Sequence, residues 1–307
     1  MPANKNTTKN TGKGLAYGLS AYFIWGSFPL IIAVISFITP IEIVAWRIVF
    51  GFALAVALIT LSRGWSSVWA VTKQPKMLGW IALATVFIYF NWLIYIYAVA
   101  SQQIIETALG YFINPLVTIL LAVVFLRERL SRLQWVAVGF GTAAVVVLSF
   151  DYGRLPWIAL ALAGSFGIYG LAKNKLGGKV SPLNSFAFES GMLIPLATIQ
   201  VVWLAGSAQG LLLATNGVLG TGAMVFFGFM TAVPLIFFGT AAKHLPLSYV
   251  GFLQYLTPLI QFVLALAVFH EAMPIARWAG FFLVWVGLAF LGVDLAKKSR
   301  NRVKKTS

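Results

Sequence analysis

Three ionisable side chains interrupt long apolar stretches of this chain: Arg47, Glu106 and Glu189. A charge at the centre of a membrane-spanning helix costs about 2.5–3.5 kcal/mol on insertion scales, so such residues are rare and usually functional. A buried arginine can pair with an anion or a carboxylate, and a buried glutamate can carry a proton. We therefore expect a pathway in which Arg47 binds an anionic group and one of the two glutamates carries protons.

A structural interpretation of the same residues stays open. Glu106 opens its predicted helix and Glu189 lies about one turn into another, so both side chains could snorkel to the interface. Arg47 lies about two turns deep, which favours a function or a buried ion pair. Glu42 is not expected to be its partner, because five residues rotate two side chains about 140° apart on an ideal helix.

Polar and aromatic side chains recur at helical spacing within the apolar stretches. A cavity that accepts amphipathic organic molecules needs aromatic walls and a few orienting polar groups. Helix–helix packing is the competing explanation, because small and polar residues are normal at such interfaces. The residues that we expect to line a pathway are Trp25, Asn91, Tyr111, Asn114, Gln254 and Tyr255.

These side chains require helices that cross a bilayer. The chain is 60% hydrophobic and 9% charged, whereas a soluble domain carries about 25% charged residues. Apolar stretches of about 20 residues, each long enough to span the hydrocarbon core, recur with short connections. We predict an all-α membrane protein with ten transmembrane helices near 14–35, 41–61, 77–99, 105–126, 132–150, 154–172, 185–204, 217–239, 246–269 and 274–295.

The distribution of lysine and arginine gives the orientation. When the connections are numbered alternately, all of the 22 basic residues except Arg47, Arg154 and Arg277 fall on one side. Cytoplasmic loops carry such an excess, which predicts a multi-pass protein of the cell inner membrane with cytoplasmic N- and C-termini. The net charge of +15 does not indicate nucleic-acid binding, because the basic residues form short clusters between apolar stretches.

The two halves of the chain resemble each other. At an offset of 143 residues, Pro115 and Pro258 coincide, and so do Glu128 and Glu271. Each half would hold five spans, an odd number, so the halves would be inverted relative to each other, as in many transporters. Chance similarity between apolar helices is the alternative. We expect the two prolines to kink their helices at symmetric places, and we divide the chain into basic tails at 1–13 and 297–307 and repeats at 14–150 and 151–296.

Signatures of catalysis and cofactor binding are missing from the sequence. The chain has no cysteine, no HExxH, no GxSxG and no Walker A sequence. Its two histidines, His244 and His270, fall in predicted loops, where solvated side chains are the usual case. We expect no enzyme activity, no metal and no cofactor.

Several sequence strings resemble the EamA-type repeats of the drug/metabolite transporter superfamily, and within it the RarD-type permeases. The resemblance extends over roughly residues 14–296, and its most specific string is Glu106-Thr-Ala-Leu-Gly-Tyr-Phe-Ile-Asn-Pro115. It implies a ten-span multidrug or metabolite permease, and the family name is linked to chloramphenicol. Supporting strings are Tyr22-Phe-Ile-Trp-Gly26, Asn91-Trp-Leu93, Leu133-Gln-Trp135, Val233-Pro-Leu235 and Gly251-Phe-Leu-Gln-Tyr255.

These observations predict a secondary transporter that moves a small organic metabolite or drug across the membrane by alternating access. Because no ATP site is recognisable, an ion or proton gradient or the substrate gradient must drive it. The resemblance favours export. A passive channel or facilitator is the first alternative, and an intramembrane enzyme would need a catalytic constellation that the sequence lacks.

Overall fold

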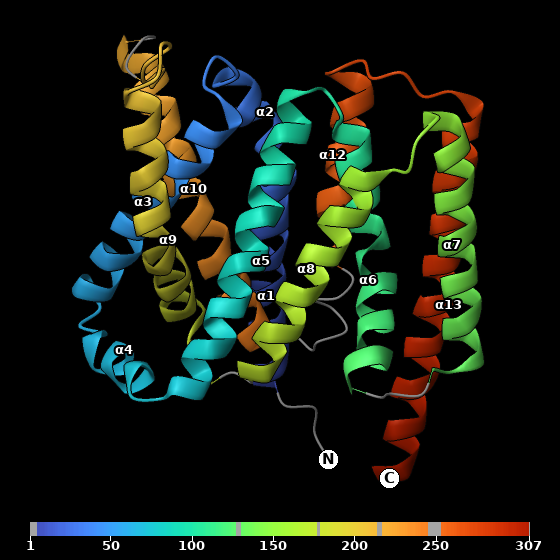
Figure 1. The fold of residues 1–307 in the computed structure, drawn as a ribbon. Helices are drawn as coiled ribbons and strands as arrows, with labels where there is room; N and C mark the ends of the chain where they lie inside the picture. Colours follow the sequence, from blue (N-terminus) through green and yellow to red (C-terminus); the bar gives the residue numbers. More distant parts are fainter. Residues whose placement is uncertain (1–4, 127–129, 177–178, 214–216, 245–252, 307) are drawn as a thin grey trace.

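The computed structural model describes residues 5–126, 130–176, 179–213, 217–244 and 253–306, and these contain helices and connections but no strand. Helix α1 begins, and helix α13 ends, on one face of the molecule, which we call the terminal face; the opposite one is the distal face (Figure 1). The helices are α1 (Lys5–Gly26), α2 (Phe28–Val34), α3 (Pro40–Leu61), α4 (Trp65–Thr72), α5 (Pro75–Ala100), α6 (Ile104–Leu126), α7 (Arg132–Tyr152), α8 (Trp157–Leu176), α9 (Pro182–Ala205), α10 (Gly217–His244), α12 (Leu256–Ala267) and α13 (Ile275–Thr306).

The prediction of an all-helical, multi-pass membrane protein is confirmed. Eight segments are long and apolar enough to cross a bilayer, and each coincides with a predicted span. The other two predicted spans, 154–172 and 246–269, fall on the shorter apolar helices Trp157–Lys173 and Leu256–Ala267. Residues 245–252, which belong to the second of these predictions, lie outside the described part of the chain.

The first predicted span is divided at Ser27 into α1 and α2. Pro29 lies at the start of α2 and has no backbone N–H to continue the helical hydrogen bonds of α1. The Ser27 hydroxyl donates to the Phe23 carbonyl at 2.8 Å. A side chain at Gly26 would lie 2.8 Å from Ile260, so this glycine lets α12 approach α1 closely where α1 ends.

The connection predicted at 62–76 contains a helix that the sequence analysis missed. Helix α4 lies along the terminal face below α3 and α5 (Figure 1). It leaves Trp65 and Trp69 exposed. Tryptophan is enriched where a membrane meets water, which explains why an eight-residue helix lies there instead of an unstructured loop.

Helix α3 is held between α9 and α10 by contacts of glycine with phenylalanine. A Cβ atom added to Gly51 would lie 3.0 Å from the Phe186 ring, and one added to Gly191 would lie 3.0 Å from the Phe52 ring. Toward α10, a Cβ atom at Gly228 would lie only 2.4 Å from Cβ of Phe50. Small residues allow such close approach of helices in a membrane, and here they hold α3 directly against α9 and α10.

Candidate functional site

Arg47 lies in the interior of α3, with 4% of its surface exposed. Its Nε donates to the hydroxyl of Thr231 on α10 at 2.9 Å. Three aromatic rings surround the guanidinium, whose Cζ lies 4.3 Å from the ring centre of Trp92, 5.3 Å from that of Phe227 and 5.6 Å from that of Phe28. Cation–π attraction therefore stabilises this charge on several sides.

A chain of polar side chains lies beside Arg47 and joins α5, α6, α8 and α12. Asn91 donates to the Ser165 hydroxyl at 3.0 Å and accepts from the Tyr111 hydroxyl at 3.4 Å. The rings of Tyr111 and Tyr95 lie 6.1 Å apart. The Tyr95 hydroxyl accepts from Gln261 at 3.1 Å. The structure thus brings Arg47, Asn91 and Tyr111, three of the residues predicted from the sequence, into one region.

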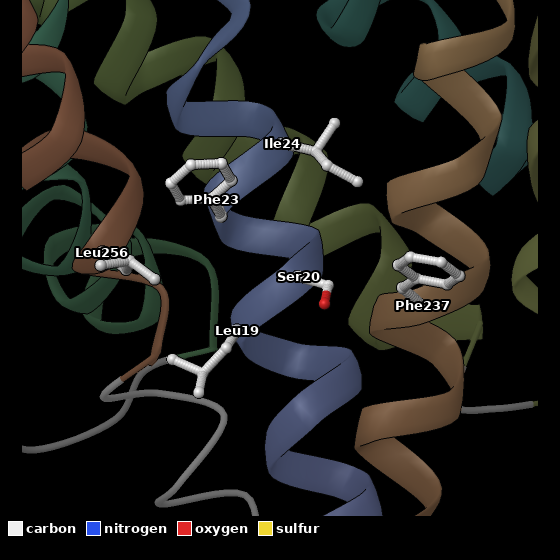
Figure 2. A pocket seen from close by; sticks show the side chains of 6 residues that line it. All are labelled: Leu19, Ser20, Phe23, Ile24, Phe237 and Leu256. Atoms are coloured by element: carbon white, nitrogen blue, oxygen red, sulfur yellow. The ribbon is translucent and has the colours of Figure 1, made fainter.

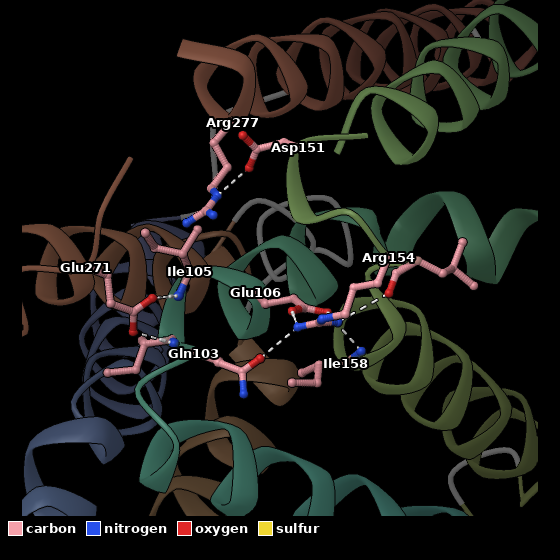
Figure 3. A network of polar contacts seen from close by, with 10 residues as sticks. Gln103, Ile105, Glu106, Asp151, Arg154, Ile158, Glu271 and Arg277 are labelled. Atoms are coloured by element: carbon pink, nitrogen blue, oxygen red, sulfur yellow. Dashed lines mark hydrogen bonds and ion pairs between the residues drawn. The ribbon is translucent and has the colours of Figure 1, made fainter. Parts of the chain in front are cut away.

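Glu106 lies at the distal end of α6 and bonds to the C-terminal half of the chain (Figure 3). Its carboxylate forms an ion pair with Arg154 at 2.9 Å and accepts from the backbone N–H of Ile158, the second residue of α8, at 3.0 Å. Arg154 also donates to Gln103 at 2.8 Å. With 1% of its surface exposed, Glu106 does not snorkel to solvent.

Glu271, in the connection after α12, binds the start of α6 (Figure 3). Its two oxygens accept from the backbone N–H groups of Ile104 and Ile105, a favourable position for a negative charge because a helix N-terminus carries a partial positive charge. Burial raises the pKa of this carboxyl above its ordinary value of 4.5, while the two N–H groups and Arg277 act in the opposite direction.

Further contacts on the distal face connect parts of the chain that are far apart in the sequence. Glu42 accepts from the backbone N–H groups of Leu212 and Leu213 at 3.0 and 2.9 Å. Asp151 forms an ion pair with Arg277 at 2.7 Å. Together with the contacts of Glu106 and Glu271, these bonds form what we call the distal latch.

Glu189 lies nearer the terminal face, in α9, with 2% of its surface exposed. Its carboxylate forms an ion pair with Lys173 at 2.6 Å and accepts from the hydroxyls of Ser185 at 2.8 Å and Tyr169 at 3.3 Å. All four residues belong to α8 and α9. Burial of this kind also contradicts a snorkelling glutamate.

The other predicted residues occupy less polar surroundings. Asn114 lies in α6, and its Oδ1 is buried without a hydrogen-bond partner in the described structure. Trp25 packs on the rings of Tyr22 and Phe238 at 5.5 and 6.0 Å. Gln254 and Tyr255 are half-buried and directly precede α12.

The two predicted kink residues differ in position. Pro115 lies inside α6, whereas Pro258 is the third residue of α12, where it interrupts no intrahelical hydrogen bond. Pro195 and Pro234 also lie inside helices, within the predicted spans, but the sequence analysis did not name them as kink candidates. Glu128, the repeat partner of Glu271, and Gly251, the first residue of one resemblance string, fall outside the described residues.

An apolar cleft of about 480 Å³ opens between α1, α10 and α12 (Figure 2). The residues that line it are Leu19, Ser20, Phe23, Ile24, Phe237 and Leu256. None of the residues predicted to line a pathway belongs to it. Leu19 and Phe23 are 46% and 60% exposed, so this cleft opens to the outside of the helix bundle, and Arg47 is not among its lining residues.

The sequence analysis missed a similarity between α3, which carries Arg47, and α9, which carries Glu189. Helices α3 and α9 begin with the same capping pattern, in which Thr39 and Ser181 accept from backbone N–H groups and a proline follows. Seven residues after that proline, α3 carries Arg47 and α9 carries Glu189. The signal that could have revealed it is the shared Ser/Thr-Pro start, at an offset of 142 residues.

The fold and these buried charges define the class of protein. Many long apolar helices, packed around an interior that holds an arginine, three glutamates and hydrogen-bonded polar side chains, are typical of membrane transporters, whose polar groups mark a substrate or ion pathway. In the part of the chain that the structure describes, no group of three His, Asp or Glu side chains could hold a metal ion.

Comparison with known proteins gives the family. Residues 12–150 match the model of the EamA-like transporter family. The chain is 44% identical over 294 residues to the protein RarD of Streptomyces exfoliatus, covering 95% of this chain and 92% of that protein. It is 35% identical over 299 residues to the transporter YojE of Bacillus subtilis, covering 94% and 97%. The chain belongs to the EamA-like transporters, and among them to the RarD-type permeases.

A solved crystal structure shares the fold. It aligns with a TM-score of 0.58 at 20% sequence identity, over 94% of this chain and 98% of the other. The family match and the long apolar helices together show a multi-pass membrane transporter, a class of protein that handles small molecules within a lipid bilayer.

Proposed function

We propose that this transporter moves a small organic metabolite or drug across the inner membrane by alternating access between two inverted five-helix repeats, 14–150 and 151–296. The first support is the packing of the helices. If α1, α3, α5, α6 and α7 correspond to α8, α9, α10, α12 and α13, most packed pairs have a counterpart. Helix α1 packs on α10 and α12, and α8 packs on α5 and α6. Such an arrangement is what two inverted repeats would produce.

The central pairs fit the same correspondence. Helix α3 packs on α9, α6 packs on α12, and α7 packs on α13, so each helix contacts its own counterpart. Ten crossings follow if the shorter helices α8 and α12 complete the eight longer ones. With lysine and arginine concentrated on the terminal face, that face would be cytoplasmic.

The main structural support for the proposal of alternating access is the distal latch. Glu42, Glu106 and Glu271 are buried or part-buried carboxylates whose bonds join one half of the chain to the other. A conformation that opens the distal face must break these bonds, and one that closes it must form them again. Such alternative sets of contacts are what a two-state transporter requires.

Proton coupling is part of this proposal and is assigned to Glu189. Its carboxylate is buried between Lys173, Ser185 and Tyr169. A proton on Glu189 would weaken the pair with Lys173 and free it to rearrange, which would link proton movement to the contact of α8 with α9. Export is the direction that the resemblance to multidrug permeases implies.

Counterflow in proteoliposomes tests the proposed function. A thermal-shift screen of the purified protein against metabolites and antibiotics first provides a ligand. Vesicles preloaded with that ligand should then accumulate labelled ligand transiently above the external concentration, because a carrier exchanges one molecule for another. A passive channel would only equilibrate the label, without the overshoot. Protein-free vesicles are the control, and flux without an overshoot would contradict alternating access.

A further inference from the structure

The charge of Arg47 has no counter-ion in the described structure. Among the described lysines and arginines, the half-buried Lys173 and Arg277 each have one, and so does the exposed Arg154. Arg47 forms none, although it is the most deeply buried of the four. An isolated charge is strongly disfavoured in an apolar interior unless it is paired. A partner from outside the chain would remove this imbalance.

The acidic residues of the described chain are engaged elsewhere. Glu42, five residues before Arg47, accepts from the Trp46 indole and from two backbone N–H groups of the connection before α10. Glu106 and Glu189 each hold their own cation. The remaining described acids are Asp151, Glu271 and Asp294, which bond to Arg277, to the start of α6 and to Ser131.

The hydrogen bonds of Arg47 leave most of its donors available. A guanidinium carries five N–H donors in a planar fork that matches the two oxygens of a carboxylate. In the described structure, the Nε group donates to Thr231, and neither η nitrogen donates to a protein acceptor. The edge of the guanidinium that would make a two-point contact with a carboxylate is therefore free of protein partners.

The surroundings of Arg47 select the rest of the ligand. The side chains around its guanidinium are the rings of Trp92, Phe227 and Phe28. Aromatic walls with a few polar groups suit a flat, apolar body that carries one polar end. Tyr95 and Tyr111, whose hydroxyls bond to Gln261 and Asn91, lie near Arg47 and supply those few polar groups. Arg47 lies seven residues, or about 10 Å, inside α3 from its distal start, a depth that suits a site reached from both faces in turn.

The pseudo-equivalent position in the other half strengthens this interpretation. Glu189 stands at the same place in α9 as Arg47 does in α3, and it is paired with Lys173. The buried charge of one half, Glu189, thus has a counter-ion from the chain itself, whereas the buried charge of the other half, Arg47, has none in the described structure. We infer that Arg47 binds the carboxylate of an aromatic organic acid, which is the substrate class of this transporter. This inference rests on the proposed function, since the acid would be bound in order to be transported.

Binding to matched acids and amides tests the inference directly. The purified protein is titrated with phenylacetate, 2-naphthoate and indole-3-acetate, and with the corresponding neutral amides, while tryptophan fluorescence and the thermal midpoint are recorded. At least one acid should bind about tenfold or more tightly than its amide, as expected for a charge-assisted contact in a desolvated site. Equal binding of acids and amides, or no binding of any acid at millimolar concentration, would overturn the inference.

Variants at the site locate the binding. Arg47→Gln should lose the preference for acids, and Arg47→Lys should keep part of it, because lysine retains the charge without the planar fork. Arg132→Gln, at an exposed arginine on α7, should bind like the unaltered protein. Circular dichroism and elution from size exclusion establish that each variant is folded. An Arg47→Gln protein that is folded and still prefers acids would refute the site.

Transport measurements separate this inference from the proposed function. If an acid binds through Arg47 but shows no counterflow, the transport proposal fails and the binding site stands. If counterflow occurs with a neutral or cationic compound and is unchanged in Arg47→Gln, transport stands and the carboxylate site is wrong.

Discussion

Arg47 and Glu189 occupy the same position in α3 and α9, seven residues after Pro40 and Pro182, and they carry opposite charges. The two helices begin on opposite faces of the molecule and pack against each other (Figure 1). Glu189 is paired with Lys173, whereas Arg47 is surrounded by aromatic rings. The two helices therefore carry a buried charge at the same position after their starting proline, but the surroundings of the two charges differ, and we propose a different task for each.

The first prediction concerns proton coupling at Glu189. Glu189→Gln keeps the size of the side chain but cannot release a proton, so an imposed pH gradient should no longer stimulate uptake. The expected loss of stimulation is about tenfold or more, measured in proteoliposomes, while counterflow continues. Lys175→Gln, at an exposed lysine of the same α8 terminus, serves as the control. A Glu189→Gln protein that keeps full stimulation would show that this carboxylate is not the proton carrier.

A second prediction concerns the ion pair of Glu106 with Arg154. Arg154 is 39% exposed, so solvent screens the pair, and a coupling energy of about 1 kcal/mol is expected. Unfolding of Glu106→Gln, Arg154→Gln and the double variant in mixed micelles gives this value. Glu106→Gln combined with Arg132→Gln should be additive, because Arg132 is exposed and lies on the opposite face. Additivity in the Glu106–Arg154 cycle would mean that the pair contributes nothing to the latch.

The pH dependence of stability reports on Glu271. Burial raises the pKa of this carboxyl in the folded protein above its ordinary 4.5, so the folded state holds the proton more tightly than the unfolded state. The contribution to stability is therefore complete below about pH 4.5 and is lost as pH rises through the folded pKa. The thermal midpoint of the unaltered protein, minus that of Glu271→Gln, should fall across this window. A difference that is constant or grows with pH would contradict the assignment.

Close packing of α10 on α3 gives a fourth prediction. A Cβ atom at Gly228 would lie 2.4 Å from Cβ of Phe50, whereas one at Gly222, in the same helix, meets nothing within 4 Å. Gly228→Ala should thus destabilise the protein by about 1–3 kcal/mol through overpacking. Gly222→Ala should be neutral or stabilising, because alanine favours the helix. Denaturant titration gives the free energy of unfolding of both variants. Equal changes in this free energy would mean that α3 and α10 are not in contact at Gly228.

Much of the fold could be predicted from the sequence, because hydrocarbon imposes a simple rule. A helix that satisfies its own backbone must be about 20 apolar residues long to cross a bilayer, so length and hydropathy alone locate Pro40–Leu61 or Ile275–Asp294. The division of the first span at Ser27 could not be predicted from length and hydropathy, because apolar residues continue on both sides of it. Helix α4 could not be predicted in this way either, because an interfacial helix is too short to be detected by hydropathy.

The candidate site could be predicted only in part. Buried charges are recognisable in a sequence because they are rare within apolar stretches, which identified Arg47, Glu106 and Glu189. Their partners were not recognisable, since pairs such as Glu106 and Arg154 are 48 residues apart and meet only through helix packing. The spacing of polar residues also does not predict which side chains meet. Asn91 accepts a hydrogen bond from Tyr111, whereas the buried Oδ1 of Asn114 has no partner among the residues that the structure describes.

Alternating access is the central claim, and cysteine accessibility tests it most directly, because the chain contains no cysteine. A single Ser165→Cys, in the polar region beside Asn91, is exposed to a membrane-impermeant thiol reagent from either face of oriented vesicles. Exposed cysteines at Ser62 on the terminal face and Ser101 on the distal face confirm the sidedness.

The same labelling is repeated after the distal latch is weakened by Glu271→Ala together with Arg277→Gln. We predict that the ratio of distal to terminal labelling at position 165 rises, because the latch bonds hold the distal face closed. A ratio that does not change when the latch is weakened, with both control cysteines reacting as expected, would contradict alternating access around the Arg47 site.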